Sequence, residues 1–139
     1  MGKRILYQNN PHFIEAIQKY GCYFLCLYMK SGSVFSYENL NQIWKDCTDA
    51  GYIKDCVMMN PGKVAAALGM QVTYNDRHDP VNYPLSADQF AVGFISYKDK
   101  THFVLLSRNK KIEYDPWKGG SECVKHGTVS SLRVFTYKE

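Results

Sequence analysis

Three segments of this chain carry the side chains of a thiol hydrolase, in the order cysteine, histidine, carboxylate. Cys22 follows Gly21 directly and opens an unbroken apolar run. His102 stands near the start of a later apolar stretch, and Asp115 follows in the sequence Tyr-Asp-Pro-Trp. A thiol, an imidazole that takes its proton and a carboxylate that orients the imidazole together form an activated nucleophile. The pattern therefore predicts a Cys-His-Asp catalytic triad.

Cys22 is better placed for reactivity than the nearby Cys26. A thiol reacts as the thiolate, which is favoured at the positive end of a helix and beside an imidazolium. Gly21 interrupts the preceding helix, so we expect Cys22 in the first turn of a new one. Cys26 lies one turn deeper on the same face, and we expect it to be buried and structural. The alternative for Cys22 is plain core packing, since free cysteine is among the most buried residue types.

The register of a β-hairpin over residues 101–115 decides whether His102 and Asp115 share a face. If the loop is residues 109–110, the two side chains are diagonal neighbours on one face. If the loop is residues 108–109, they lie directly opposite each other. A shift by one residue would put them on opposite faces and exclude the dyad. For Asp115 the alternative is turn chemistry, because Asp-Pro starts turns readily, and both roles are compatible.

An acyl-transfer site also needs hydrogen-bond donors for the oxyanion. The backbone N–H of Cys22 is one donor if this residue heads a helix. Gln18, four residues earlier, is the candidate side chain. Its alternative is an ordinary solvated position on a helix.

These motifs resemble the papain-like cysteine peptidase fold, in the compact bacterial form shared with double-glycine leader peptidases. The chain is similar still more closely to a small uncharacterised family from phages, prophages and spirochaete plasmids. The resemblance covers nearly the whole chain and implies a single papain-like domain over residues 1–139. It also implies a cysteine peptidase that cleaves a peptide or isopeptide bond without a cofactor. The matching segments are Gly21-Cys22-Tyr23-Phe24, Thr101-His102-Phe103-Val104-Leu105, Tyr114-Asp115-Pro116-Trp117, Val124-Lys125-His126-Gly127 and Arg133-Val134-Phe135.

The chain departs from the leader peptidases at two positions. Their oxyanion glutamine lies six residues before the cysteine, where this chain has Ala16, and a glycine usually follows the cysteine, where it has Tyr23. Loss of one oxyanion donor costs about a hundredfold or more in rate. The alternative function is therefore a catalytically weak or inactive binding module, for example a phage protein that binds and inhibits a host protein. The expected partner is a peptide or protein substrate or such a host protein.

Composition narrows the remaining function classes. The chain has 139 residues, one domain's worth, and an apolar share of 45%, typical of a globular protein. The net charge of +4 comes without a basic run, so nucleic-acid binding is not expected. The five cysteines complete no four-ligand zinc set, and no metal is expected. Without a secretory signal or a membrane-length apolar run, we expect a cytoplasmic protein with reduced thiols. The oligomeric state stays open.

Periodicity predicts helices first and strands afterwards, that is, an α+β fold with N-terminal helices packed on a C-terminal antiparallel sheet. The third helix has Ser36 as its cap, and the fourth starts at Asn60-Pro61 and ends at Gly69. A polar loop is expected over residues 75–84. The expected helices are 11–19, 22–29, 37–50 and 61–68, and the expected strands are 70–74, 90–97, 101–107, 111–115 and 132–137.

Overall fold

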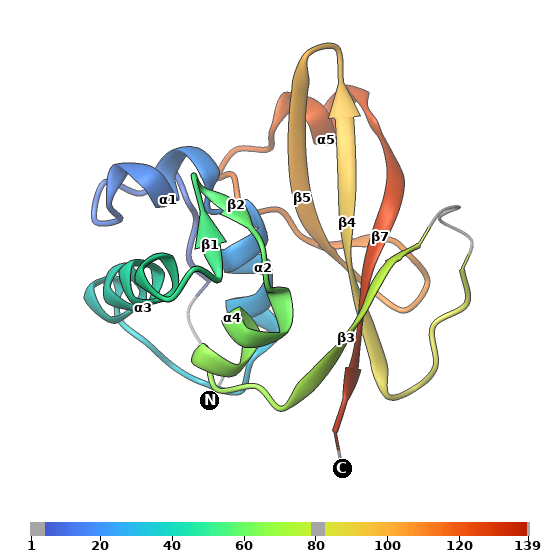
Figure 1. Cartoon of the computed structure of the whole chain (residues 1–139). Helices are drawn as coiled ribbons and strands as arrows, with labels where there is room; N and C mark the ends of the chain where they lie inside the picture. Colours follow the sequence, from blue (N-terminus) through green and yellow to red (C-terminus); the bar gives the residue numbers. More distant parts are fainter. Residues whose placement is uncertain (1–4, 79–82, 139) are drawn as a thin grey trace.

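In the computed structural model, which describes residues 5–78 and 83–138, four helices precede a five-stranded antiparallel sheet, and a fifth helix lies between its last two strands (Figure 1). The predicted α+β class is confirmed. The helices are α1 (Glu15–Tyr20), α2 (Cys22–Lys30), α3 (Tyr37–Asp49), α4 (Pro61–Ala67) and α5 (Glu122–His126). The strands are β1 (Ile53–Lys54), β2 (Val57–Met58), β3 (Val72–His78), β4 (Gln89–Tyr97), β5 (Lys100–Leu106), β6 (Ile112–Tyr114) and β7 (Thr128–Tyr137).

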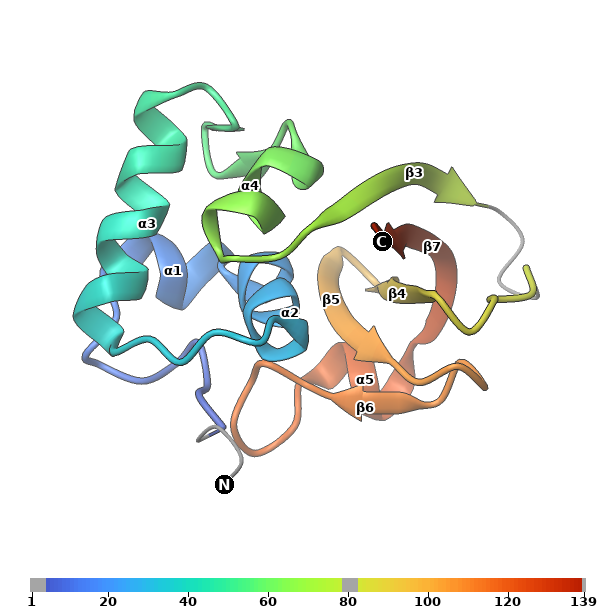
Figure 2. The ribbon, with the colours of Figure 1, turned by 90° about the horizontal axis from the view of Figure 1, so that it is seen from below.

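The sheet has the strand order β3-β7-β4-β5-β6, and it separates two apolar cores. Successive residues of a strand face opposite sides. Val92 and Leu105 belong to the core shared with the N-terminal helices, whereas Ala91 and Val104 belong to the core shared with α5. Both views show α2 between α3 and β5 (Figure 2). Helix α2 therefore joins the helical half of the molecule to the sheet.

Helix α2 is apolar on all sides because it is buried on all sides. Its six residues from Tyr23 to Tyr28 are buried, and the Cys26 sulfur lies 3.8 Å from the carbonyl oxygen of Phe103 on β5. Gly21 permits the close approach to α1: a Cβ there would lie 2.6 Å from the Ile17 carbonyl oxygen and 2.7 Å from Ile17 Cγ2. A glycine between α1 and α2 thus makes Cys22 the first residue of the central helix.

The helix starts predicted from capping residues are confirmed. Ser36 Oγ accepts from the Asn39 N–H at 3.0 Å, and Asn39 Oδ1 accepts from the Ser36 N–H at 3.2 Å, a reciprocal capping box. Asn60 Oδ1 accepts from the Lys63 N–H at 3.2 Å and so caps α4, with Pro61 in the first turn. Past the end of α4, Gly69 takes the left-handed conformation (φ +90°) that favours glycine.

Other boundaries differ from the prediction. The first helix begins at Glu15 instead of Pro11, because the Phe13 N–H bonds back to Asn10 in a turn. Strand β3 runs to His78, so the predicted loop over residues 75–84 is wrong in its first part. Residues 79–82 of that loop lie outside the described residues.

Two short elements were not predicted. Helix α5 is one, and the β1–β2 hairpin is the other. The hairpin turns at Asp55 and Cys56, both with positive φ (51° and 64°), a conformation that Asn-Gly usually supplies. Within residues 5–78 and 83–138, no helix has the length and apolar character to cross a membrane.

Candidate active site

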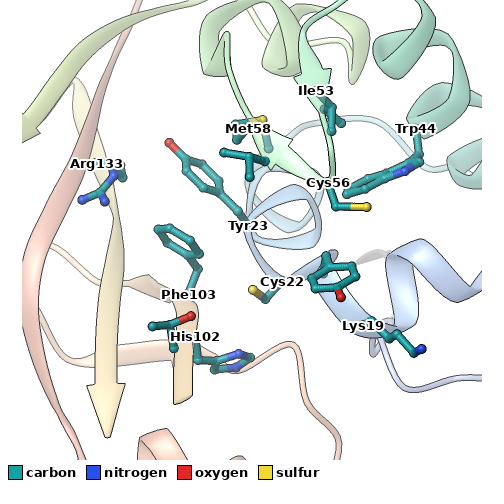
Figure 3. A pocket seen from close by; sticks show the side chains of 13 residues that line it. Lys19, Cys22, Tyr23, Trp44, Ile53, Cys56, Met58, His102, Phe103 and Arg133 are labelled. Carbon is teal, nitrogen blue, oxygen red and sulfur yellow. The ribbon is translucent and has the colours of Figure 1, made fainter. Parts of the chain in front are cut away.

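Cys22 lies where the helical half meets the sheet. It is half-buried at the start of α2, where the first N–H groups have no acceptor within the helix. Figure 3 shows its sulfur on the side of α2 that faces His102 and Phe103 of β5. The thiol and the imidazole therefore come from different halves of the fold.

His102 and Asp115 form a short hydrogen-bonded pair. His102 Nε2 lies 2.7 Å from Asp115 Oδ1, and the imidazole is only 7% exposed. On the strands that carry them, Leu105 pairs with Tyr114, the register expected for a loop over residues 109–110. The turn between the two strands is longer than the expected two residues, and a bulge between Leu105 and Leu106 restores that register. The expectation that the two side chains share a face is confirmed.

Asp115 is held by three donors. Besides His102, the backbone N–H of Trp117 donates to Oδ1 at 2.9 Å and that of Ser121 donates to Oδ2 at 3.1 Å. Burial alone would raise the pKa of Asp115, but these hydrogen bonds outweigh it and lower the pKa. The carboxylate thus organises the turn after β6 and orients the imidazole at the same time.

The imidazole is poised to carry a positive charge. Burial lowers the pKa of His102, but the hydrogen bond to Asp115 and the interactions with the Cys22 thiol raise it more, to about 9. At neutral pH His102 is therefore largely protonated. Because Asp115 occupies Nε2, the nitrogen left for the Cys22 thiol is Nδ1. A sulfur beside an imidazolium whose far side is fixed by a carboxylate is the arrangement of an activated thiol.

Gln18 has other contacts than those expected of an oxyanion donor. Its Nε2 donates to the carbonyl oxygen of Phe13 at 2.7 Å, and it lines neither pocket beside Cys22. The side chain closes the turn before α1. Its own carbonyl oxygen accepts from Gln8 Nε2 at 3.1 Å.

Gln8 is a site residue that the sequence did not reveal. It is 2% exposed and lines a pocket together with Cys22 and His102. Its Oε1 is buried without a hydrogen-bond partner among the described residues. Its backbone N–H donates to Pro116 O at 2.8 Å, beside the Asp115 turn. The pairing of two distant segments places Gln8, and no local motif marks it.

Two further contacts hold this N-terminal segment, which we call the strap (residues 6–9), against the turn after β6. The Tyr114 hydroxyl donates to the Leu6 carbonyl oxygen, and the Lys118 N–H donates to Asn9 Oδ1 at 3.0 Å. The strap is thereby fixed on both sides of Gln8.

Two pockets meet at the Cys22–His102 pair. The apolar pocket has a volume of about 330 Å³ and extends between β5 and the β1–β2 hairpin. The polar pocket, about 420 Å³, extends toward Gln8, Trp117 and α5. Cys22, His102, Lys19 and Thr101 line both. Volumes of this size accommodate side chains of a bound ligand, and a ligand crossing from one pocket to the other passes the thiol.

The other thiols are less suited to reaction. Cys26, Cys47 and Cys123 are buried, which raises the pKa of each, to about 11 for Cys47. Cys26 is more buried than Cys22, as predicted. Only Cys56, in the β1–β2 turn, is exposed to a similar degree. In the described part of the chain, no cluster of three His, Cys, Asp or Glu side chains could hold a metal ion.

Comparison with known proteins gives a family without an assigned activity. The family model described as a protein of unknown function, DUF261, matches residues 3–137. No curated protein and no solved structure matches the chain. The match spans Cys22, His102 and Asp115, and it leaves their chemistry to be inferred from the site itself.

Proposed function

Because the chain belongs to the DUF261 family, whose description assigns no function, we propose its activity from its own site. The protein is a papain-like cysteine peptidase that cleaves a peptide or isopeptide bond through Cys22, His102 and Asp115. The observation that carries the proposal is the buried His102–Asp115 pair, with Nε2 and Oδ1 2.7 Å apart, beside a half-buried thiol at the start of a helix. Cys22 and His102 line the same two pockets.

The first half of the reaction is acylation. The Cys22 thiolate attacks the carbonyl carbon, a C–S bond forms, and the carbonyl electron pair moves to oxygen. When this tetrahedral intermediate collapses, the C–N bond breaks and the leaving nitrogen takes the proton from His102 Nδ1. A thioester on Cys22 and a free amine result.

The second half is hydrolysis of the thioester. Neutral His102 takes a proton from water, and the hydroxide attacks the thioester carbon. The C–S bond then breaks, the thiolate leaves, and the proton stays on His102. The carboxylic acid product departs, and the charged pair of thiolate and imidazolium is restored.

The oxyanion needs donors in both halves. The Cys22 backbone N–H at the start of α2 and the Gln8 side-chain amide are the best-supported pair. Gln8 Nε2 uses one hydrogen on the Gln18 carbonyl oxygen and retains a second. Gln8 thus takes the role that the sequence suggested for Gln18. It also offsets the lack of a glutamine at position 16.

The papain-like assignment rests on arrangement. A cysteine at the start of a buried central helix and a histidine on an adjacent antiparallel strand support it. Tyr23 departs from the leader-peptidase motif. Its ring is buried and packs on Phe103 at a centroid distance of 4.6 Å. The bulky side chain therefore belongs to the contact between α2 and β5 and does not block the thiol.

The test is cleavage of a mixed peptide library, with new N-termini identified by mass spectrometry. Wild-type protein and Cys56→Ala are both expected to cleave, because Cys56 is not the proposed nucleophile, whereas Cys22→Ala gives no cleavage. Cys56 is the matched control because it is the other half-exposed thiol and lines the apolar pocket. Cleavage that persists in Cys22→Ala would refute the thiol mechanism. Absence of cleavage by folded wild-type protein would favour the alternative of a binding module.

A further inference from the structure

The apolar pocket has a cationic end. Arg133 of β7 lines it, and Figure 3 shows this side chain away from Cys22, beyond Tyr23 and Phe103. Aromatic and aliphatic side chains from both halves of the fold line the pocket between Arg133 and the catalytic residues. They include Tyr23, Trp44, Ile53, Val57, Met58 and Phe103.

Arg133 is held in place by its neighbours. The guanidinium carbon lies 5.5 Å from the ring centroids of both Phe94 and Phe103, within the range of cation–π attraction. Nη1 donates to Ser131 Oγ at 2.9 Å. Within residues 5–78 and 83–138, Nε and Nη2 make no hydrogen bond and no carboxylate pairs with the group. A fixed guanidinium with unused donors is suited to a carboxylate, which it can bind through two parallel hydrogen bonds.

Arg77 on β3 is the direct cross-strand partner of Arg133, so both side chains project from one face of the sheet. Of the two, only Arg133 lines the pocket, and its guanidinium supplies the positive charge at this end.

From these contacts, and on the basis of the proposed peptidase function, we infer that the substrate is an acidic–apolar peptide segment. A large apolar side chain next to the scissile bond fills the apolar pocket, and a carboxylate further along the same segment pairs with Arg133. A segment with lysine or arginine in place of the carboxylate is rejected by the same group.

Binding to the Cys22→Ala protein tests the inference without hydrolysis. The probe is the end-blocked peptide Glu-Phe-Gly-Gly-Phe-Glu, whose symmetry presents the apolar–acidic pair in either chain direction. The comparison peptides are Gln-Phe-Gly-Gly-Phe-Gln and Lys-Phe-Gly-Gly-Phe-Lys, blocked at both ends in the same way. Calorimetry is expected to show the Glu peptide binding about tenfold tighter than the Gln peptide, the scale of a charge-assisted pair, and the Lys peptide weakest.

Charge variants locate the effect. Arg133→Glu in the same background is expected to reverse the order of the Glu and Lys peptides, and Arg133→Gln to remove the preference. The matched control is Lys111→Glu, an equal charge change on an exposed residue outside the pocket, which is expected to keep the order. Should Arg133→Glu fail to fold, Arg133→Gln decides the question alone. Equal affinities for all three peptides, or an order unaffected by Arg133, would overturn the inference.

The peptidase proposal is judged separately, from cleavage of the Glu peptide by the wild-type protein. A charge preference without cleavage supports the pocket assignment and counts against the peptidase. Cleavage without a charge preference supports the peptidase and counts against the pocket assignment.

Discussion

Asp115 accepts the Nε2 proton of His102 at 2.7 Å, and this contact decides which nitrogen serves Cys22. With Nε2 engaged, the ring can give or take a proton at the thiol only through Nδ1. The same contact contributes to the high pKa of His102, about 9, which burial alone would lower. This hydrogen bond therefore fixes the orientation of the imidazole and, together with the interactions with Cys22, favours its charged form at neutral pH.

Alkylation by iodoacetamide tests the activated thiol. Cys22 is expected to react on the order of tenfold faster than Cys56 near pH 6.5, where an ordinary thiol is almost fully protonated. His102→Ala is expected to remove this advantage, because the counter-charge for the thiolate is lost. Peptide mapping by mass spectrometry at several times gives a rate for each cysteine. Equal rates for Cys22 and Cys56 in the wild-type protein would contradict the model of an activated thiol.

Substitution of Asp115 tests the orienting role. Asp115→Ala is expected to lower the pKa of His102 from about 9 and to reduce peptide cleavage on the order of a hundredfold or more. Asp115→Asn keeps an oxygen acceptor for Nε2 and is expected to lose less activity. NMR titration of the His102 ring measures the pKa independently of turnover. A pKa unchanged in both variants would exclude the proposed role of the carboxylate.

Substitution of Gln8 and of Gln18 tests which of the two side chains donates to the oxyanion. Gln8→Ala is expected to reduce kcat by about a hundredfold or more while leaving iodoacetamide alkylation of Cys22 unchanged, since alkylation forms no oxyanion. Gln18→Ala removes only a hydrogen bond to Phe13 O and is expected to affect stability by about 1 kcal/mol and kcat little. Steady-state kinetics and urea unfolding distinguish them. The reverse pattern would return the oxyanion role to Gln18.

Gly21→Ala tests the junction of α1 and α2. The added methyl would lie 2.6 Å from a backbone oxygen of Ile17, so the helices must move apart. We expect a loss of stability of roughly 1–3 kcal/mol, the range for overpacking, together with slower alkylation of Cys22. Gly32→Ala is the control, because its methyl would meet nothing within 4 Å. Equal unfolding midpoints for the two variants would rule out steric control by Gly21.

The pH dependence of stability follows from the raised pKa of His102. Its folded pKa of about 9 exceeds the ordinary value of 6.5. The ion pair therefore stabilises fully below pH 6.5, and this contribution disappears as the pH rises through 9. The stability gap between wild type and His102→Gln is expected to shrink by up to roughly 3 kcal/mol between pH 6 and pH 10. Ionisation of buried Cys26 and Tyr114 at alkaline pH destabilises both proteins equally, so this effect does not change the difference between them. A gap constant with pH would exclude the ion pair.

Local signals predicted much of the helical half. Ser36 and Asn60 mark helix starts because capping is satisfied within a few residues of each. The continuous apolar run after Cys22 predicted a buried helix, because a helix that is apolar on all sides is buried on all sides. The β1–β2 hairpin escaped prediction because Cys56 stands at the positive-φ turn position where glycine usually marks such a hairpin. There, tertiary packing overrides local preference.

Some residues of the candidate site could likewise be predicted from the sequence, and others could not. Cys22, His102 and Asp115 could be selected from residue type and strand register, and the hydrogen bond of the dyad agrees with that register. Gln8 could not be selected in this way, because only the contacts of the strap bring it to the polar pocket. Arg133 also acquires its place from the sheet order, which sets β7 beside β3 and β4. Both depend on contacts between segments far apart in the chain.

The contact between Cys26 and Phe103 has a consequence for the candidate site. Each of these packing residues stands near a site residue, Cys26 one turn after Cys22 and Phe103 directly after His102. A substitution that shifts α2 on β5 therefore alters the spacing of thiol and imidazole even when every site residue is retained. A change in this core can therefore lower the proposed turnover while Cys22, His102 and Asp115 are all retained.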